Sequence, residues 1–592
     1  MGTRRPAPAR RPAPPRRRPK RRRVVRLGSP GRRLKFGLVT VLVLFAVIGG
    51  RLVQLQGLDG TAYASQAERL RLRNVVLTAQ RGDILDRDGN VLARTVAART
   101  VFADPKLVVD PAATAARLAG PLAIDQGTLE AQLRKPGRFV VLKRTMLPEA
   151  AQAIMDLDLP GIGTQPESQR EAPGRDLAAN VIGFVGRDGK GLAGIESRYD
   201  AVLRGTPGVH DYQTAPGGQV MPSDLERTVP AVPGRSVLLT LDRDLQYVAQ
   251  QALAERMQQT GAYTGSAVVL DVKTFQVMAM ASYPTYDAGN PSAAPASARG
   301  NAAVSNVVEP GSIHKAVTIS GALQAGVIDA NTALIVPPTI TKGGKTFRDT
   351  HKHGTVGITL MGILAQSSNV GTIEIADRLG AQGLYDYQRK FGLGSKTGLD
   401  FPGESPGIVQ PPSNWSGPSH GGIPIGLGVA VTPLQMAVVY ATIANDGLRL
   451  TPSLVRGFRA ADGTVTAAPR PKATRVLSPE VAAVMRTDLS AITSKHATGR
   501  RAAIAGYVVA GKTGTGQRVE NGHYTQGNVT SFIGMAPAEN PRYVVAVFVH
   551  APNGVGGAVS GPVFQELMGY LLRHYRVPPE GRAPPEQFLA AN

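Results

Sequence analysis

The chain has 592 residues, with 67 Lys and Arg against 43 Asp and Glu, which gives a formal net charge of +24. It contains no cysteine, which excludes disulfides, thiol catalysis and Cys-ligated metal sites. Residues 1–35 hold fifteen Lys or Arg and no acidic residue. The excess of positive charge therefore belongs largely to the amino-terminal tail.

An apolar segment follows this tail. Residues 1–35 interleave Arg and Lys with Pro, which predicts a disordered tail and is also typical of nucleic-acid-binding arms. Phe36–Gly50 is an uninterrupted run of apolar, small or Thr residues that continues past Arg51. Roughly twenty such residues span a bilayer. We therefore predict one membrane anchor at 36–56, a cytoplasmic amino terminus and no nucleic-acid partner, because a basic flank stays on the cytoplasmic side.

A cleaved signal peptide is the alternative, and Ala62-Tyr-Ala64 offers a small-x-small cleavage site. This site lies too far beyond the apolar run, so a retained anchor is favoured. The bulk of the chain is then expected outside the cytoplasmic membrane, a location that counts against ATP and nicotinamide cofactors.

After the anchor the chain is long enough for two domains. We predict the first over residues 57–233, the second over 234–575, and a short carboxy-terminal tail over 576–592. The first domain opens with Gln80–Ala93, in which Asp88-Gly-Asn90 lies between apolar alternations. That pattern predicts a β-hairpin with a tight turn.

In the second domain, the strand signals lie at the two sequence ends and the helical signals lie between them. The predicted strands are Ser266–Asp271, Gln276–Ala281, Tyr507–Lys512, Ser531–Ala536 and Tyr543–Val549. The predicted helices are Ala316–Val327, Leu360–Leu379 and Pro433–Asp446. Strands drawn from both ends around a helical middle indicate one α+β unit, with a central antiparallel sheet flanked by helices.

Three short polar motifs follow one another in this domain: Ser312-Ile-His-Lys315, Ser367-Ser-Asn369 and Lys512-Thr-Gly514. Each motif alone is short enough to arise by chance. Together they supply a nucleophile, a base, a proton relay and a group that binds a carboxylate. The set and its order are the evidence, rather than any single motif.

The first motif has the residues of an activated nucleophile. A Ser is a poor nucleophile until a neighbour takes its proton. If a helix begins at Ser312, Lys315 lies one turn further on the same face, and the helix dipole favours an alkoxide on Ser312. Burial would make a neutral Lys315 easier to reach, as a base requires. The alternative for the isolated motif is a helix N-cap Ser followed by an exposed Lys.

The second motif, Ser367-Ser-Asn369, is a polar break between two apolar helical stretches. Ser and Asn are good helix N-caps, so the pair could simply begin a helix at Gly371–Leu379. A catalytic and a capping interpretation are compatible with each other.

The third motif follows a β-branched run that reads as a strand. A strand edge with Lys512 and the hydroxyls of Thr513 and Thr515 can hold a carboxylate, and it leaves a backbone N–H free to face an oxyanion. Gly506–Thr513 also matches the phosphate-binding loop G-x-x-x-x-G-K-[ST]. That loop needs a helix at its Lys, but Gly514, Thr515 and Gly516 follow here, so we reject ATP binding.

The three motifs, with Glu309-Pro-Gly before the first and Ala510-Gly before the third, resemble those of class B penicillin-binding proteins. The resemblance implies the penicillin-recognising serine transpeptidase fold for 234–575. It also implies that 57–233 is the extended pedestal, or dimerisation, domain, whose opening motif R-G-x-I-x-D-R-x-G matches Arg81–Gly89. One departure is that Arg170–Gly174 lacks the aromatic residue that the family often has before its Pro.

The resemblance further implies a D,D-transpeptidase that cross-links peptidoglycan stem peptides through an acyl-enzyme on Ser. No cofactor and no metal are implied. The expected functions are Ser312 as nucleophile, Lys315 as base, Ser367 as proton relay, Asn369 as binder of the substrate amide, Lys512, Thr513, Gly514 and Thr515 as the carboxylate-binding strand, and the backbone N–H groups of Ser312 and Thr515 as the oxyanion hole.

The expected partners are stem peptides with a D-Ala-D-Ala donor and an amine acceptor, β-lactams, the cytoplasmic membrane, and a separate membrane glycan polymerase with other division proteins. Lys390–Gly394 and the long Arg/Pro tail look most like the septal branch of high-GC bacteria. The alternatives are an elongation-type transpeptidase, a D,D-carboxypeptidase or β-lactamase, and a non-catalytic β-lactam sensor or division scaffold.

Overall fold

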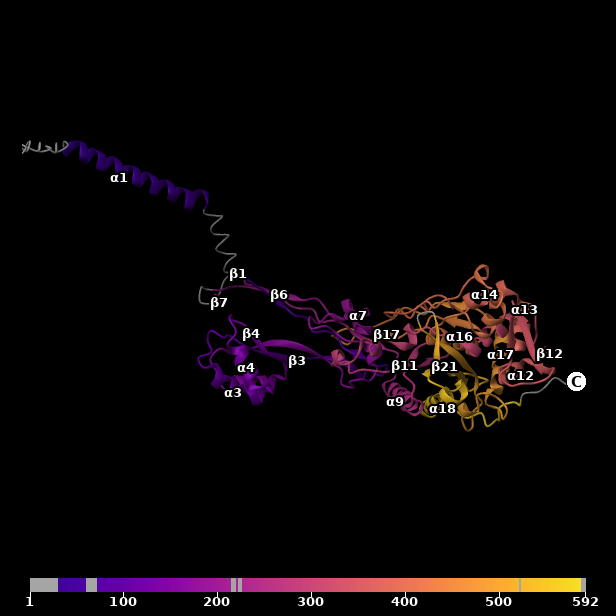
Figure 1. Ribbon diagram of the computed structural model, residues 1–592. Helices are drawn as coiled ribbons and strands as arrows, with labels where there is room; N and C mark the ends of the chain where they lie inside the picture. The colour runs from indigo at the N-terminus through magenta and orange to yellow at the C-terminus, as the bar shows by residue number, and fades with distance from the viewer. Residues whose placement is uncertain (1–29, 60–71, 215–219, 222–225, 521–522, 587–592) are drawn as a thin grey trace, which may run out of the picture. The chain divides into compact units, whose positions relative to one another are not determined.

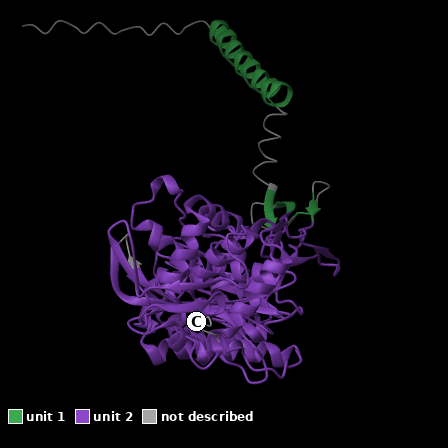
Figure 2. Ribbon diagram, turned by 90° about the vertical axis from the view of Figure 1, so that its right-hand side faces the viewer, with its two compact units in different colours: residues 1–76, 209–229 green, residues 77–208, 230–592 purple. Residues whose placement is uncertain are grey.

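The computed structural model describes residues 30–59, 72–214, 220–221, 226–520 and 523–586. Most of the predicted basic tail, and the end of the predicted carboxy-terminal tail, lie outside the described residues. The chain divides into two compact units, shown in Figure 2: residues 1–76 with 209–229, and residues 77–208 with 230–592.

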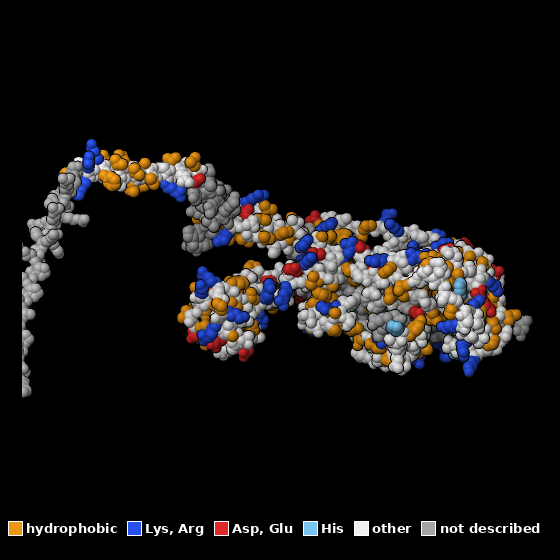
Figure 3. Space-filling model, turned by 45° about the horizontal axis from the view of Figure 1, so that its top comes forward, with side chains coloured by type: hydrophobic (Ala, Val, Ile, Leu, Met, Phe, Trp, Pro, Cys, Tyr) orange, Lys and Arg blue, Asp and Glu red, His pale blue; other side chains and the backbone are white. Residues whose placement is uncertain are grey.

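The first unit contains a long apolar helix and a small sheet. Helix α1 (Pro30–Val53) continues into a π-helical turn, η1 (Gln54–Leu58); an 18-residue window of this helix has a mean hydropathy of 2.3, and neither element has a buried residue. Figure 3 shows hydrophobic side chains along α1. The predicted anchor at 36–56 therefore coincides with a helix long and apolar enough to cross a membrane. The small sheet consists of β1 (Leu72–Leu77), β6 (Gly208–Thr214), β7 (Val220–Met221) and β8 (Arg227–Val229).

In the second unit, a seven-stranded sheet in the described part of the chain combines four strands of the amino-terminal domain with β9, β17 and β18, which lie in the predicted second domain. The order is β18-β17-β9-β2-β3-β4, and β5 also pairs with β3. The predicted hairpin is confirmed, because β2 pairs with β3 and the Asp86 carboxylate accepts the backbone N–H groups of Asp88 and Asn90 within the turn. The strands are β2 (Ile84–Leu85), β3 (Val91–Ala103), β4 (Val140–Met146), β5 (Ile162–Glu171), β9 (Ser236–Leu239), β17 (Val455–Arg459) and β18 (Val465–Ala467).

Helices α3 (Pro111–Leu122), α4 (Gln126–Leu133) and α5 (Pro148–Met155) share a separate small core with β3, β4 and β5. Between β5 and β6 lie three short helices: α6 (Ala179–Ile182), α7 (Gly194–Arg198) and α8 (Asp200–Leu203).

The carboxy-terminal domain contains the predicted antiparallel sheet. Its five described strands have the order β11-β10-β22-β21-β20, so strands from both ends of the domain lie side by side. Their bounds are β10 (Thr264–Asp271), β11 (Val277–Tyr283), β20 (Ala510–Glu520), β21 (His523–Ala536) and β22 (Tyr543–Ala551).

The predicted strand Tyr507–Lys512 is misplaced, because β20 begins only at Ala510 and continues to Glu520. The glycine-rich first part of β20 has low strand propensity, but β20 is hydrogen-bonded to β21 along its whole length, with Lys512 opposite Ile533. Pairing between strands therefore overrides local propensity here.

Two layers of helices cover this sheet (Figure 1). The two-residue period of β10 places Ala267 and Val269 in one core and Val268 and Leu270 in the other. The first core contains α9 (Arg243–Thr260) and α18 (Gly556–His574). The second core contains α11 (Lys315–Gln324), α12 (Leu360–Gln366), α13 (Asn369–Leu379), α16 (Pro433–Ala444) and α17 (Pro479–Leu489). The α+β layout is as predicted.

Candidate active site

The nucleophile motif forms a 3₁₀ turn, η4 (Gly311–His314), that leads directly into α11. The predicted helix start at Ser312 is therefore nearly right, although the α-helix proper begins at Lys315. Ser312 is partly exposed, whereas Lys315 is completely buried. Tyr440 of α16 holds this turn, because its hydroxyl donates to the carbonyl of Ile313 at 3.0 Å.

The Lys315 ammonium lies against the second motif. Its Nζ donates to the Ser367 carbonyl at 2.6 Å, to the Ser367 hydroxyl at 3.2 Å and to Asn369 Oδ1 at 2.7 Å. Burial lowers the pKa of Lys315 to about 7, and the negative charge of Asp349 opposes that change. The neutral amine that a general base requires is therefore populated near neutral pH.

The second motif is the junction of α12 and α13. Ser367 ends α12 in the left-handed region, with a φ of 62°, which turns its carbonyl and hydroxyl toward Lys315. The N-cap of α13 is Ser368, whose hydroxyl accepts the backbone N–H of Gly371 at 3.0 Å. The predicted helix start at Gly371 is thus two residues late. The capping and site interpretations apply to different residues of the motif.

The third motif lies inside β20. Lys512 is completely buried, and its Nζ donates to the Thr513 carbonyl at 3.2 Å. Burial, and then the charge of Lys315, lower the pKa of Lys512 well below its usual value. The hydroxyl of Thr513 lies 2.7 Å from that of Thr498, whereas Thr515 is exposed and its hydroxyl accepts the backbone N–H of Gly556.

The nucleophile turn and β20 touch through their backbones. Gly311 has a φ of +56°, and a Cβ on it would lie 2.8 Å from the carbonyl oxygen of Thr515. Likewise, a Cβ on Gly514 would lie 2.9 Å from the carbonyl oxygen of Pro310. Real Cβ atoms do not approach backbone so closely, so glycine is required at both places. The structure thus brings all three motifs together.

Comparison with known proteins agrees with this geometry. Residues 76–239 match the family described as the penicillin-binding protein dimerisation domain, and residues 265–569 match the penicillin-binding protein transpeptidase domain. The chain belongs to the class B penicillin-binding proteins. Both the predicted family and the predicted fold are confirmed.

Named relatives share most of the length of this class B protein. The penicillin-binding protein PbpB of Mycolicibacterium smegmatis is 36% identical over 92% of this chain and 91% of its own. The peptidoglycan D,D-transpeptidase FtsI of Escherichia coli K12 is 33% identical over 91% of each. Penicillin-binding protein 3 of Mycobacterium tuberculosis, solved as a complex with ampicillin, has a TM-score of 0.70 and 34% identity, and covers 88% of this chain and 100% of its own.

Sequence reasoning missed several residues that hold the site of this class B enzyme together. Tyr440 and Thr498 lie outside the motifs in the sequence, and no local pattern marks them. Asp349 was also missed, because it lies in none of the three motifs. The described residues around it, 349–355, form neither helix nor strand, and His353 contacts Asp349.

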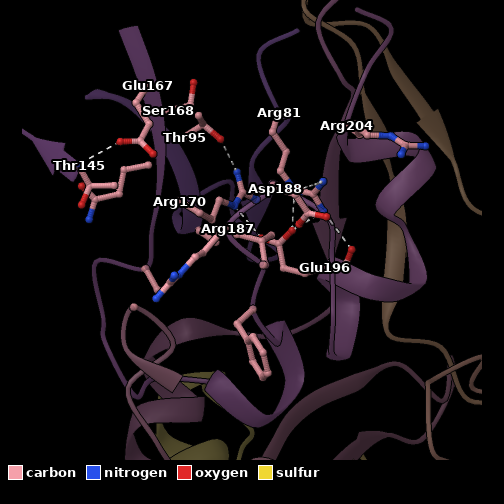
Figure 4. Close-up of a pocket in the computed structure, with 18 of the residues that line it drawn as sticks. Arg81, Thr95, Thr145, Glu167, Ser168, Arg170, Arg187, Asp188, Glu196 and Arg204 are labelled. Atoms are coloured by element: carbon pink, nitrogen blue, oxygen red, sulfur yellow. Dashed lines mark hydrogen bonds and ion pairs between the residues drawn. The ribbon is translucent and has the colours of Figure 1, made fainter. Parts of the chain in front are cut away.

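A hollow of about 880 Å³ is lined mainly by the amino-terminal domain, together with Ala288, Gly289 and Pro291, and its lining includes none of the three motifs. Figure 4 shows its charged wall. The Glu196 carboxylate accepts hydrogen bonds from the guanidinium groups of Arg81 and Arg170, each with a nitrogen–oxygen distance of 2.6 Å. Arg81 also contacts Asp200 at 2.7 Å. All three members of the Arg–Glu–Arg cluster are over nine-tenths buried. The first Arg of the R-G-x-I-x-D-R-x-G motif is therefore part of a buried ion network.

Proposed function

We propose that this class B penicillin-binding protein is a peptidoglycan D,D-transpeptidase that cross-links stem peptides, most like the septal type. One observation carries the proposal. A buried Lys315 with a pKa of about 7 donates hydrogen bonds to both Ser367 and Asn369, and it lies one helical turn after the partly exposed Ser312. The names of FtsI and PbpB relatives over nearly the whole chain support it.

In the proposed first step, Ser312 Oγ attacks the carbonyl carbon of the penultimate D-Ala, and neutral Lys315 accepts the hydroxyl proton. The negative oxygen that develops is stabilised by the backbone N–H groups of Ser312 and Thr515. As the intermediate collapses, the C–N bond breaks and the proton passes through Ser367 to the departing amine of the terminal D-Ala. Asn369 binds the substrate amide and orients Lys315.

In the proposed second step, the amine of a neighbouring stem peptide attacks the acyl-enzyme. Its proton is removed through the same groups, and Ser312 is released as the free alcohol. Lys512, Thr513, Gly514 and Thr515 are assigned to the donor carboxylate. An arriving carboxylate favours the charged form of Lys512 and so offsets the burial that lowers its pKa.

The same reactivity explains inhibition by β-lactams. A β-lactam presents a strained amide and a carboxylate in the arrangement of the donor, so opening of its ring would leave Ser312 acylated. Solved relatives from Mycobacterium tuberculosis are complexes with aztreonam and ampicillin, which supports this expectation for the present chain.

We also propose that α1 anchors the protein in the cytoplasmic membrane, with its amino terminus in the cytoplasm and its catalytic domain outside. The apolar, wholly exposed helix and the basic residues before it support this orientation. A separate membrane glycan polymerase and other division proteins are the proposed partners, because a transpeptidase acts on glycan strands that another enzyme polymerises.

The test is the intact mass of the 57–592 ectodomain after incubation with a penicillin, beside Ser312→Ala. We expect a stable adduct with the mass of the penicillin on the wild-type protein and none on the variant. Rapid turnover of the penicillin would instead indicate a β-lactamase. If neither adduct nor turnover appears for the ectodomain or for the full-length protein in membranes, the proposed acyl-enzyme is wrong.

A further inference from the structure

Asp349 follows β14 (Lys345–Arg348) and lies against the second motif. Its Oδ1 accepts the backbone N–H groups of Asn369 at 2.5 Å and Val370 at 2.9 Å, and its Oδ2 accepts the Ser368 hydroxyl at 2.7 Å. Its side chain is 10% exposed. One largely buried carboxylate therefore accepts from three donors at the start of α13.

These donors are in the places where a helix needs acceptors. The first backbone N–H groups of a helix have no partner within it, and the positive end of the helix dipole favours a negative charge there. Ser368 is the N-cap, so Asp349 adds an acceptor for groups that the cap does not reach. The preceding residue contributes as well, because the Arg348 carbonyl accepts from Asn369 Nδ2 at 2.9 Å. Arg348 and Asp349 together hold both the backbone and the side chain of Asn369.

His353 closes the outer side of Asp349. Its Nε2 lies 3.0 Å from Asp349 Oδ2, and its Nδ1 lies 2.6 Å from the Gly354 carbonyl. Both ring nitrogens therefore face acceptors, an arrangement that only the doubly protonated ring satisfies. In agreement, the hydrogen bond to Gly354 and the contact with Asp349 raise the pKa of His353.

We propose that Asp349 is a positioning residue for acyl transfer, which acts through the first turn of α13 to hold Ser367 and Asn369 against Lys315. The proposal rests on the proposed function. Lys315 itself depends on this arrangement, because all three of its acceptors belong to Ser367 and Asn369.

Asp349 also affects Lys315 electrostatically. Its negative charge favours the protonated amine, so it limits how far burial lowers the pKa of Lys315. Other charged groups also interact with Asp349 and Lys315. Lys512, on the facing strand β20, interacts with Lys315, and His353 and Glu374 interact with Asp349. Loss of the Asp349 charge should therefore shift the protonation of Lys315, an effect that loss of packing alone would not produce.

Three variants of the ectodomain separate these effects. Asp349→Asn keeps an oxygen that can accept a hydrogen bond but removes the charge, and Asp349→Ala removes both. Asp377→Asn is the matched control, because Asp377 lies on α13, the helix that Asp349 contacts, but pairs with Lys342 on the exposed side, at 2.6 Å. Acylation by a fluorescent penicillin is measured from weakly acidic to weakly alkaline pH.

We expect the acid limb of the Asp349→Asn profile to move to lower pH. Without the Asp349 charge the pKa of Lys315 falls, so the neutral amine is populated at lower pH. We expect Asp349→Ala to lose about 100-fold of its plateau rate, the size of effect that a misplaced reacting group produces. Asp377→Asn should match the wild type. Backbone amide exchange at Asn369 and Val370, which needs no activity, should be faster in Asp349→Ala than in Asp377→Asn.

Two results together would overturn the proposal. The pH midpoint of acylation in Asp349→Asn would equal that of the wild type, and Asp349→Ala would reach the wild-type plateau rate. If Asp349→Ala does not fold, the pH profile of Asp349→Asn decides. Failure of the proposed function is distinct, because the wild-type protein would then not be acylated at all, and the amide-exchange comparison would still test whether Asp349 holds α13.

Discussion

At the scale of the residue, the site depends on how two lysines are buried. Lys315 has three hydrogen-bond acceptors and a pKa of about 7, whereas Lys512 has one backbone acceptor and a pKa that burial lowers well below its usual value. A buried ammonium is costly unless it is paired, so both sites favour the neutral amine until a substrate arrives. Lys315 is thereby suited to accept a proton and Lys512 to receive a carboxylate.

A pH profile follows from the Lys315 environment. Because only the neutral amine can accept the Ser312 proton, the acylation rate should rise through about pH 7 and reach a plateau above it. Below the pKa the rate should fall by about tenfold per pH unit. Stopped-flow acylation by a fluorescent penicillin measures the profile. Lys315→Met should lose about 100- to 10,000-fold of the plateau rate.

Lys390→Met is the control for that measurement, since Lys390 is an exposed lysine of α14 (Ala381–Lys390), and it should behave as the wild type. A rate that does not change between pH 6 and pH 8 would contradict the assignment of Lys315 as the base.

At the scale of the element, the important contact is between η4 and β20. Their backbones approach so closely that Gly311 and Gly514 have no room for a side chain. Gly426 adds to this arrangement, because a Cβ on it would lie 2.2 Å from the Gly311 carbonyl oxygen. Three glycines thus allow the close backbone packing around the nucleophile turn.

Gly311→Ala should therefore separate the nucleophile turn from β20. We expect the acylation rate to fall by about 100-fold, because a small displacement of reacting groups has that effect. Gly326→Ala is the matched control: Gly326 follows the same helix α11, also has a positive φ (+70°), and has open space around its missing Cβ. It should lose some stability but keep the wild-type acylation rate. Equal rates in the two variants would show that the contact does not position Ser312.

At the scale of the whole molecule, the two domains named by the family matches are not independent in this chain. Ile84, Leu92 and Ile195 of the amino-terminal domain belong to the same core as Val268 and Phe548 of the catalytic sheet. The strand β9 also joins them, because it pairs with β2 on one side and with β17 on the other. Residues 77–208 and 230–592 accordingly form one compact unit.

Loss of Glu196 should destabilise this unit, because it lies between Arg81 and Arg170 and all three are buried. Removal of one member of a buried ion network leaves uncompensated charge, which typically costs about 3–5 kcal/mol. We expect Glu196→Ala to lower the unfolding temperature of the ectodomain strongly. The exposed pair of Arg94 and Glu171 provides the control, and Glu171→Ala should change stability by less than about 1 kcal/mol. A Glu196→Ala protein as stable as this control would contradict the interpretation.

Local sequence was enough to predict the family, the long apolar helix, the α+β layout and the order of the three motifs. These features are carried by runs of neighbouring residues: an apolar segment, β-branched strands at both ends of a domain, and short polar signatures. Their chemistry depends on residue type, which the sequence states directly, although the individual functions of the motif residues stay predictions until they are tested.

The start of β20, the cap of α13 and the shared core could not be predicted in this way. β20 is a strand because of its partner β21, and Asp349 lies beside Asn369 only because the chain folds back after β14. Tyr440 reaches Ile313 across more than a hundred residues. Local periodicity contains no information about such contacts, since each depends on which segments the packing brings together. That packing also buries Lys315 and so lowers its pKa to about 7, whereas an exposed lysine would stay protonated and could not act as a base.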